Sequence, residues 1–191
     1  AVLQRSRKDP IFEFTNAMAD RDLAAALFFM QSLLDDGMHP LQLLAAAANQ
    51  VRRLLLAKDF IVRDRGRSWM AGMDFGRFKA TCFPTIRDDD AALNALVGDW
   101  DVILHPLREG GRPKKSAASD LVLAKNPKSP FPVFHILQRA ERFSLETLRS
   151  AVIDLSAVDQ RMKSTGQDPR MLLEAFLIDF CRSADGPTES I

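Results

Sequence analysis

The feature that most constrains this chain is the helical spacing of its apolar residues, which dominates its first and last thirds. In "QDPRMLLEAFLIDF", residues 167–180, large apolar residues recur at intervals of three and four, which places them on one face of an α-helix. Asp168 is a typical N-cap, and Pro169 suits the first helical position, where no N–H is needed. We therefore interpret Asp168 as a helix cap rather than a catalytic acid. The predicted buried face consists of Leu172, Leu173, Phe176, Leu177 and Phe180.

Three helices are predicted in the first third of the chain. The first follows an N-cap at Asp9, and the second runs from Asp20 to Gly37, a residue suited to a left-handed C-cap. The third starts at Pro40 and continues to about Asp64. Its predicted apolar stripe is Leu41, Leu44, Ala48, Val51 and Leu55. A patch of small residues at 45–48 would let a neighbouring helix approach closely.

The last third begins with a helix predicted to end near Phe143. Ser144 then caps a long helix, with Glu146 in the first turn, where an acid is favourable, and Gly166 ends it. The apolar stripe of this long helix is predicted to be Leu145, Leu148, Leu155, Val158, Met162 and Val152. Together with the first third, these patterns predict an all-α fold, an antiparallel helical bundle.

The middle of the chain, residues 65–130, has a different character. "DDDAALNALVGDW" predicts a short helix capped by its aspartates, whereas "FGRFKATCF" fits a helix or a strand equally well. "LREGGRPKKSAASD" is a loop by composition. We expect residues 65–130 to be a mixed or loop-rich insertion in a domain covering 9–182, with flexible termini at 1–8 and 183–191.

Composition argues against several functional classes. The chain carries 26 basic and 25 acidic residues, so its net charge of +1 gives no overall preference for nucleic acid or membrane. Cys82 and Cys181 are far apart and lack metal-type spacing, which indicates reduced structural thiols. The sequence has neither a membrane-length apolar run nor a signal peptide, so we expect a cytoplasmic protein. Its first residue is not Met, as in a fragment of a longer chain or a cloning remnant.

No pattern of catalytic residues or cofactor ligands stands out. A phosphate-binding G-x-x-x-x-G-K-[ST] loop is absent, and "GGRPKKS" has the wrong spacing. His39 and His105 precede proline, which indicates turn or cap roles, and His135 is expected to be a packed or surface residue. The acidic run 87–90 is more typical of a helix N-terminus than of a Mg²⁺ site. We expect no metal, no cofactor and no enzymatic activity.

Basic residues are locally dense in two places. Arg63, Arg65 and Arg67 follow the third helix. The loop carries a second group, the candidate nucleic-acid residues Arg108, Arg112, Lys114 and Lys115. A solvated loop is the favoured interpretation, and the alternative is a salt-dependent contact with DNA through these side chains.

Particular sequence words resemble a known family. "DPIFEFTNAMADRDLAAAL" and "LLDDGMHPLQLLAAAANQVRRLLLAK" are similar to the opening of the C-terminal domain of the bacterial DNA polymerase III delta subunit, a clamp-loader subunit. The segment from "FPVFHILQRAERF" to "GQDPRMLLEAFLIDF" resembles the closing helices of that domain, including Phe-Ser before a long helix and Asp-Pro-Arg before Leu-Leu-Glu. The two blocks, about residues 9–64 and 130–182, occur in the family's order.

The resemblance implies a collar domain, which packs with equivalent domains of gamma/tau- and delta-prime-type subunits and neither hydrolyses ATP nor grips the clamp. It implies at most weak or indirect contact with DNA and none with membrane. The family usually has only a short segment where this chain has residues 65–130. Polar residues that the core does not need are candidates for the interface with other subunits. They are Arg52, Arg53, Lys58, Arg161 and Lys163.

Overall fold

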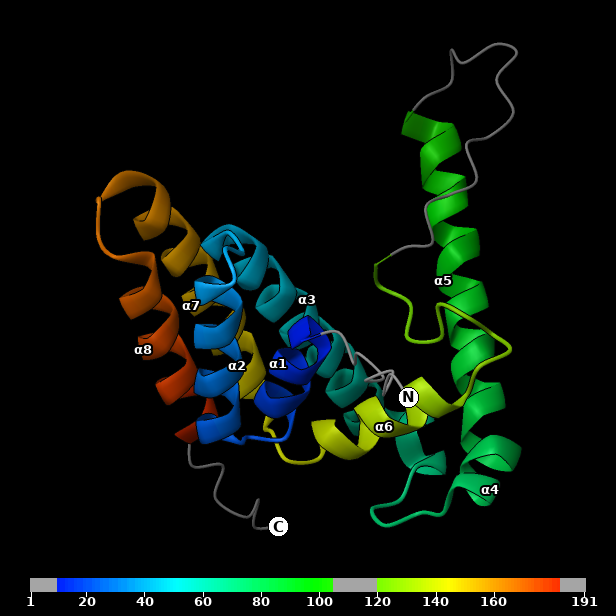
Figure 1. Cartoon of the computed structure of the whole chain (residues 1–191). Helices are drawn as coiled ribbons and strands as arrows, with labels where there is room; N and C mark the ends of the chain where they lie inside the picture. The colour runs from blue at the N-terminus through cyan, green and yellow to red at the C-terminus, as the bar shows by residue number, and fades with distance from the viewer. Residues whose placement is uncertain (1–9, 105–119, 183–191) are drawn as a thin grey trace, which may run out of the picture. The chain divides into compact units, whose positions relative to one another are not determined.

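A computed structural model describes residues 10–104 and 120–182, and within these ranges the chain is helical and forms no strand (Figure 1). The predicted all-α fold is therefore confirmed. Contacts divide the chain into two compact units. Unit 1 combines residues 1–55 with 139–191, and unit 2 comprises residues 56–138. Among the described helices, none has both the length and the apolar content needed to cross a membrane.

Unit 1 is built mainly from long helices joined by short turns. The helices are α1 (Pro10–Ala19), α2 (Leu23–Asp35), α3 (Pro40–Val62), α7 (Leu145–Ser164), α8 (Pro169–Arg182) and the end of α6 (Phe131–Ala140). Residues 56–62 of α3 and 131–138 of α6 belong to unit 2. Helix α1 packs on α2, α2 on α8, and α7 on α8. The short turns make α1 and α2, and likewise α7 and α8, antiparallel neighbours (Figure 1).

Helix ends in unit 1 are set by the predicted caps. The Ser144 hydroxyl accepts a hydrogen bond from the backbone N–H of Thr147 at 3.0 Å, and the Asp168 carboxylate accepts one from the N–H of Arg170 at 2.9 Å. Gly166 has a φ of +64°, as a left-handed C-cap requires. The predicted face of α8 is buried in full. Asp9 lies outside the described residues.

Two predicted helix boundaries were wrong. The second helix begins at Leu23 rather than Asp20, because the cap is Asp22, whose carboxylate accepts a hydrogen bond from the N–H of Ala25 at 3.0 Å. Helix α6 ends at Ala140 rather than near Phe143. Phe143 is instead buried in unit 1, where its ring stacks on that of Phe180 in the core.

The turn between α1 and α2 connects distant parts of unit 1. Arg139 donates two hydrogen bonds to the Asp20 carboxylate, at 2.8 and 3.1 Å. Arg142 also contacts this carboxylate, at 3.2 Å. The next residue, Arg21, has a φ of +58°, and its guanidinium lies 4.3 Å from the centroid of the Phe143 ring. This turn therefore fixes the end of α6 and the start of α7 against α1 and α2.

Unit 2 is organised around aromatic rings. It contains the end of α3, a 3₁₀ helix (Asp64–Ser68), α4 (Phe75–Arg77), a π-helical turn (Phe78–Cys82) and α5 (Phe83–Leu104). Phe78 is fully buried, and its ring centroid lies 5.2 Å from that of Phe134 and 5.9 Å from that of Trp69. Gly66 packs so closely on the carbonyls of Phe60 and Ile61 that any Cβ would clash.

The structure settles the undecided segment of the middle region and extends the helix predicted there. "FGRFKATCF" is helical and runs from α4 through the π-helical turn into α5. Pro84, with no N–H to donate and a ring that crowds the preceding turn, accounts for this wider turn. The predicted short helix is instead the 22-residue α5, and the aspartates at 88–90 lie inside it rather than at its start.

Replacing Asp20 with Ala is expected to lower the free energy of unfolding by about 1–3 kcal/mol, because the largely buried Arg139 loses its charged acceptor. The measurement is urea unfolding followed by circular dichroism. Asp35→Ala is the matched control, since Asp35 is exposed and pairs with Arg170 only at 3.5 Å. The control is expected to change stability by less than about 0.5 kcal/mol. Equal midpoints for the two variants would contradict the role assigned to Asp20.

Burial raises the pKa of the Cys181 thiol to about 11, and of its charged neighbours Arg21 lowers the pKa and Asp22 raises it. The unfolded chain releases this proton near pH 9, so the stabilisation is complete below about pH 9 and is lost between about pH 9 and 11. The loss amounts to about 2–3 kcal/mol. The free energy of unfolding, measured from about pH 8 to 11, should fall less steeply for Cys181→Ala than for the unchanged chain. Parallel curves would show that this thiol does not couple to folding.

Candidate functional site

A surface groove of about 460 Å³ lies between α3 and α7 in unit 1. Both helices are labelled in Figure 1. Residues of α3 line one wall, namely Leu41, Leu44, Ala45, Ala48, Asn49 and Arg52. Residues of α7 line the other, namely Val152, Leu155, Ser156 and Asp159.

The groove is apolar at its base and charged at its edge. Leu44 and Leu155 are buried, whereas Ala45 and Ser156 are small and exposed. Val152 remains 38% exposed. Small residues above a leucine floor leave room for larger side chains of another helix, which can then approach to about 8–10 Å between axes. The arrangement suits the seating of a helix rather than chemistry on a small molecule.

Three residues predicted to belong to the core stripes line this groove without being buried. They are Leu41 and Ala48, which are half-buried, and Val152, which is exposed. The stripes read from the sequence were therefore broader than the buried core. The patch at 45–48 was the sequence signal for the groove on the α3 side, and nothing in the local pattern marked Ser156.

The five interface candidates are dispersed. Arg52 lines the groove, and Lys163 reaches its edge through an ion pair with Asp159 at 2.7 Å. Arg161 donates a hydrogen bond to the side chain of Gln167 at 2.9 Å. Lys58 belongs to unit 2. The last candidate, Arg53, lies close to a second cation, Arg139. Partial burial lowers the pKa of Arg53, and the charge of Arg139 lowers it further.

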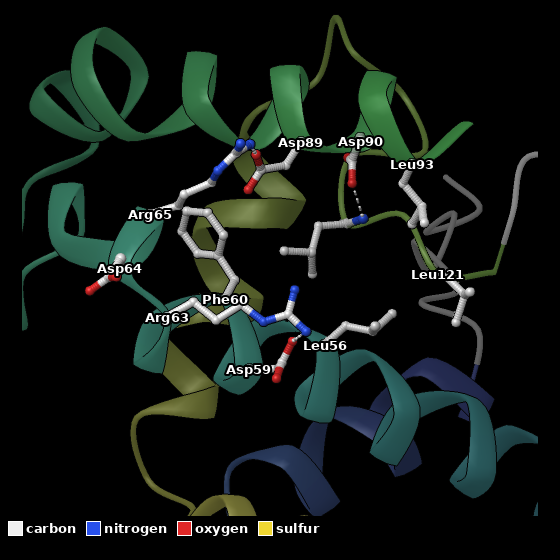
Figure 2. A pocket seen from close by; sticks show the side chains of 11 residues that line it. Leu56, Asp59, Phe60, Arg63, Asp64, Arg65, Asp89, Asp90, Leu93 and Leu121 are labelled. Atoms are coloured by element: carbon white, nitrogen blue, oxygen red, sulfur yellow. Dashed lines mark hydrogen bonds and ion pairs between the residues drawn. The ribbon is translucent and has the colours of Figure 1, made fainter. Parts of the chain in front are cut away.

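A second groove, of about 670 Å³, lies within unit 2 (Figure 2). Its apolar residues are Leu56, Phe60, Leu93, Leu121 and Leu123. Its charged residues are Asp59, Arg63, Asp64, Arg65, Asp89 and Asp90. The aspartates outnumber the arginines, so this groove has an acidic lining.

The aspartates of α5 have structural partners in this groove. Asp90 accepts hydrogen bonds from the backbone N–H groups of Leu123 at 3.0 Å and Ala124 at 2.7 Å, the first of which Figure 2 shows. Burial raises the pKa of the Asp90 carboxyl, and these two bonds oppose that rise. Asp89 pairs with Arg65. Across the described ranges, no cluster of His, Cys, Asp or Glu has the composition to hold a metal ion.

The basic residues after α3 are paired with acids. Arg63 contacts Asp59 at 2.6 Å, and Arg67 contacts Asp64 at 3.0 Å. The candidate nucleic-acid residues Arg108, Arg112, Lys114 and Lys115 lie outside the described residues.

Two histidines can be placed. His39 accepts a hydrogen bond through Nδ1 from the N–H of Leu41 at 3.2 Å, the expected capping role. His135 packs edge-on against Phe131, with 4.3 Å between ring centroids, as expected of a packed side chain. His105 lies outside the described residues.

Comparison with curated proteins and solved structures identifies similar chains. DNA polymerase III subunit delta of Bacillus subtilis (strain 168) is 24% identical over 181 residues, which cover 95% of this chain and 37% of that protein. The structure of the Bacillus subtilis DNA clamp loader delta protein (YqeN) matches with a TM-score of 0.53 and 22% identity, over 90% of this chain and 35% of that one. At this identity the structural likeness shows the fold alone. The chain thus spans little more than a third of these relatives.

A family model gives the firmest match. The family described as "DNA polymerase III delta subunit, C-terminal domain" matches residues 8–73 and 107–180. The unmatched stretch, 74–106, contains α4, the π-helical turn and α5, and lies inside the predicted insertion. Because the match covers well over half of the residues, this chain belongs to the family formed by the C-terminal domains of DNA polymerase III delta subunits.

Proposed function

We propose that this chain is an assembly domain of the DNA polymerase III clamp loader, which holds the delta subunit in a collar while the sliding clamp is loaded during DNA replication. Membership of the delta C-terminal family supports this proposal. The partners are gamma/tau- and delta-prime-type subunits, and the domain contributes binding rather than catalysis. Contact with DNA is indirect or weak.

The observation that carries this proposal is the groove between α3 and α7. It combines a leucine floor, small residues and an exposed Val152, and it belongs to the part of the chain that the family model matches. Val152 is 38% exposed there, so the groove offers apolar surface that is not buried within the chain. A neighbouring subunit's helix laid here would bury this surface, which provides a driving force that is not directional.

Charged residues at the edge give such an interface its orientation. Arg52 lies on the α3 side, and Asp159 lies on the α7 side in an ion pair with Lys163, so a partner helix meets a cation on one wall and an ion pair on the other. Charges placed in this way favour one direction of docking more than they increase affinity. Arg53, Lys58, Arg161 and Lys163 are proposed as further polar contacts with other subunits.

Ala45→Trp tests the groove directly. A tryptophan at this exposed lining position would occupy the space left for a partner helix without removing any core residue. We expect binding to purified gamma/tau- and delta-prime-type subunits, measured by calorimetry at moderate salt after nuclease treatment, to weaken by about tenfold or more. The apolar contact should persist at moderate salt.

Ala157→Trp is the matched control, because Ala157 is exposed on α7 but does not line the groove. This control should bind like the unchanged chain. Equal binding by Ala45→Trp would exclude the groove as the place where other subunits bind. If the unchanged chain bound none of these subunits but bound duplex DNA in the same assay without nuclease, a nucleic-acid-contacting role for the basic loop would replace the assembly role.

A further inference from the structure

Helix α5 carries an apolar stripe that the described residues leave partly exposed. Leu93, Leu96, Val97 and Trp100 follow one another at helical spacing and therefore share one face. Leu96 is 45% exposed and Trp100 55% exposed. Large apolar residues grouped on one exposed face mark an interaction surface more often than singly scattered ones do.

Burial along α5 changes abruptly at Ile86. Phe83 and Ile86 are buried, whereas none of residues 87–100 is buried. The first part of the helix is therefore held in the aromatic core of unit 2, and about four turns, residues 87–100, extend from it. Residues 87–100 keep an amphipathic pattern, although packing within the described residues does not require one there.

Charge on this part of α5 has a single sign. From Asp88 to Leu104 the sequence contains five aspartates and no lysine or arginine. Asp88 and Asp99 are exposed. Asp89 pairs with Arg65 and Asp90 accepts from backbone N–H groups, so the exposed Asp88 and Asp99 are the acids of this part of α5 that can attract lysine and arginine of a partner.

The stripe continues into the acidic groove of unit 2. Leu93 lines that groove together with Leu121 and Leu123, as Figure 2 shows for the first two. Leu121 is itself 55% exposed. The apolar surface therefore extends from Trp100 along α5 to the mouth of a groove lined by four aspartates and two arginines.

We propose that the surface formed by Leu93, Leu96, Val97, Trp100 and the adjoining groove is a docking site for a basic amphipathic helix of a partner protein. Tryptophan in such a contact is a common source of binding energy. This site is separate from the groove between α3 and α7, and it lies on a helix that the family model does not match. It therefore goes beyond the assembly function proposed above.

Charge excludes the other common occupants of an apolar helix face. Nucleic acid and anionic lipid would be repelled by the aspartates. A second copy of this chain would bring the same acidic flanks against one another. A partner with basic flanks satisfies both the apolar and the electrostatic character of the surface.

Trp100 allows a direct test with a probe peptide. The probe is a peptide of Leu and Lys at helical spacing, of about 18 residues so that it can form a stable helix. Saturable binding is expected by anisotropy of the labelled peptide, with a blue shift of tryptophan emission. The other tryptophan, Trp69, is only 6% exposed and should contribute little to the shift. A peptide of Leu and Glu with the same spacing should bind at least about tenfold more weakly.

Variants then locate the contact. Leu96→Ser combined with Val97→Ser should weaken binding of the Leu/Lys peptide by about tenfold or more, and Asp99→Lys should weaken it and reduce its salt dependence. Ala95→Ser is the control, since Ala95 is exposed on the opposite face of α5. These positions are not in the core, so all variants should keep the circular dichroism of the unchanged chain.

Each alternative occupant gives a distinct result that would overturn the proposal. Equal binding of the Leu/Lys and Leu/Glu peptides, or full binding by the Leu96→Ser, Val97→Ser variant, would remove the site. A blue shift with phosphatidylserine vesicles or duplex DNA in place of the peptide would assign the surface to lipid or nucleic acid. A shift that grows with the concentration of the chain alone, with a dimer in analytical ultracentrifugation, would assign it to self-association.

Discussion

The bond between Arg139 and Asp20 joins residues 119 positions apart, and the packing of unit 1 depends on it. Its surroundings explain why the α1–α2 turn is specified so closely. Asp20 accepts from two arginines, Arg21 adopts a left-handed backbone conformation that brings its guanidinium over Phe143, and Asp22 caps α2. Three consecutive charged residues thus have three separate tasks. A charge-assisted pair is stronger than a neutral hydrogen bond, and partial burial protects it from screening.

Local chemistry made part of this fold predictable from the sequence. Helix α8 follows from an Asp-Pro start and an apolar face, and α7 from a serine cap and a terminal glycine, because such signals act within one turn of the chain. Contacts between distant residues were beyond this reasoning. Asp90 reaches backbone groups more than thirty residues away, although its position in an acidic run resembled a helix start. Val152 keeps the period of a core residue but lies on the groove, since periodicity gives the direction of a face and not its width.

The two grooves differ in the kind of recognition that their residues allow. Between α3 and α7, small side chains lie above buried leucines, with Arg52 and the Asp159–Lys163 ion pair at the edge, so shape dominates. In unit 2, exposed leucines and a tryptophan accompany an excess of aspartates, so charge selects among partners that are equally apolar. The first groove lies in the stretch that the family shares, and α5 lies in the stretch outside the family match. One chain can therefore combine a binding surface in the stretch shared with the family and a second binding surface on α5.

The division of unit 1 into two sequence segments has a consequence for synthesis on the ribosome. Unit 2 is complete at residue 138, whereas unit 1 needs residues 139–191 as well. At about 5–20 residues per second, those last residues take roughly 3–10 s to translate. During this interval the apolar faces of α1 and α2, including Phe14 and Met30, lack the helices that bury them in the finished domain. The nascent chain is then prone to aggregation and to binding by chaperones. The helices of unit 2, by contrast, already have almost their full sequence.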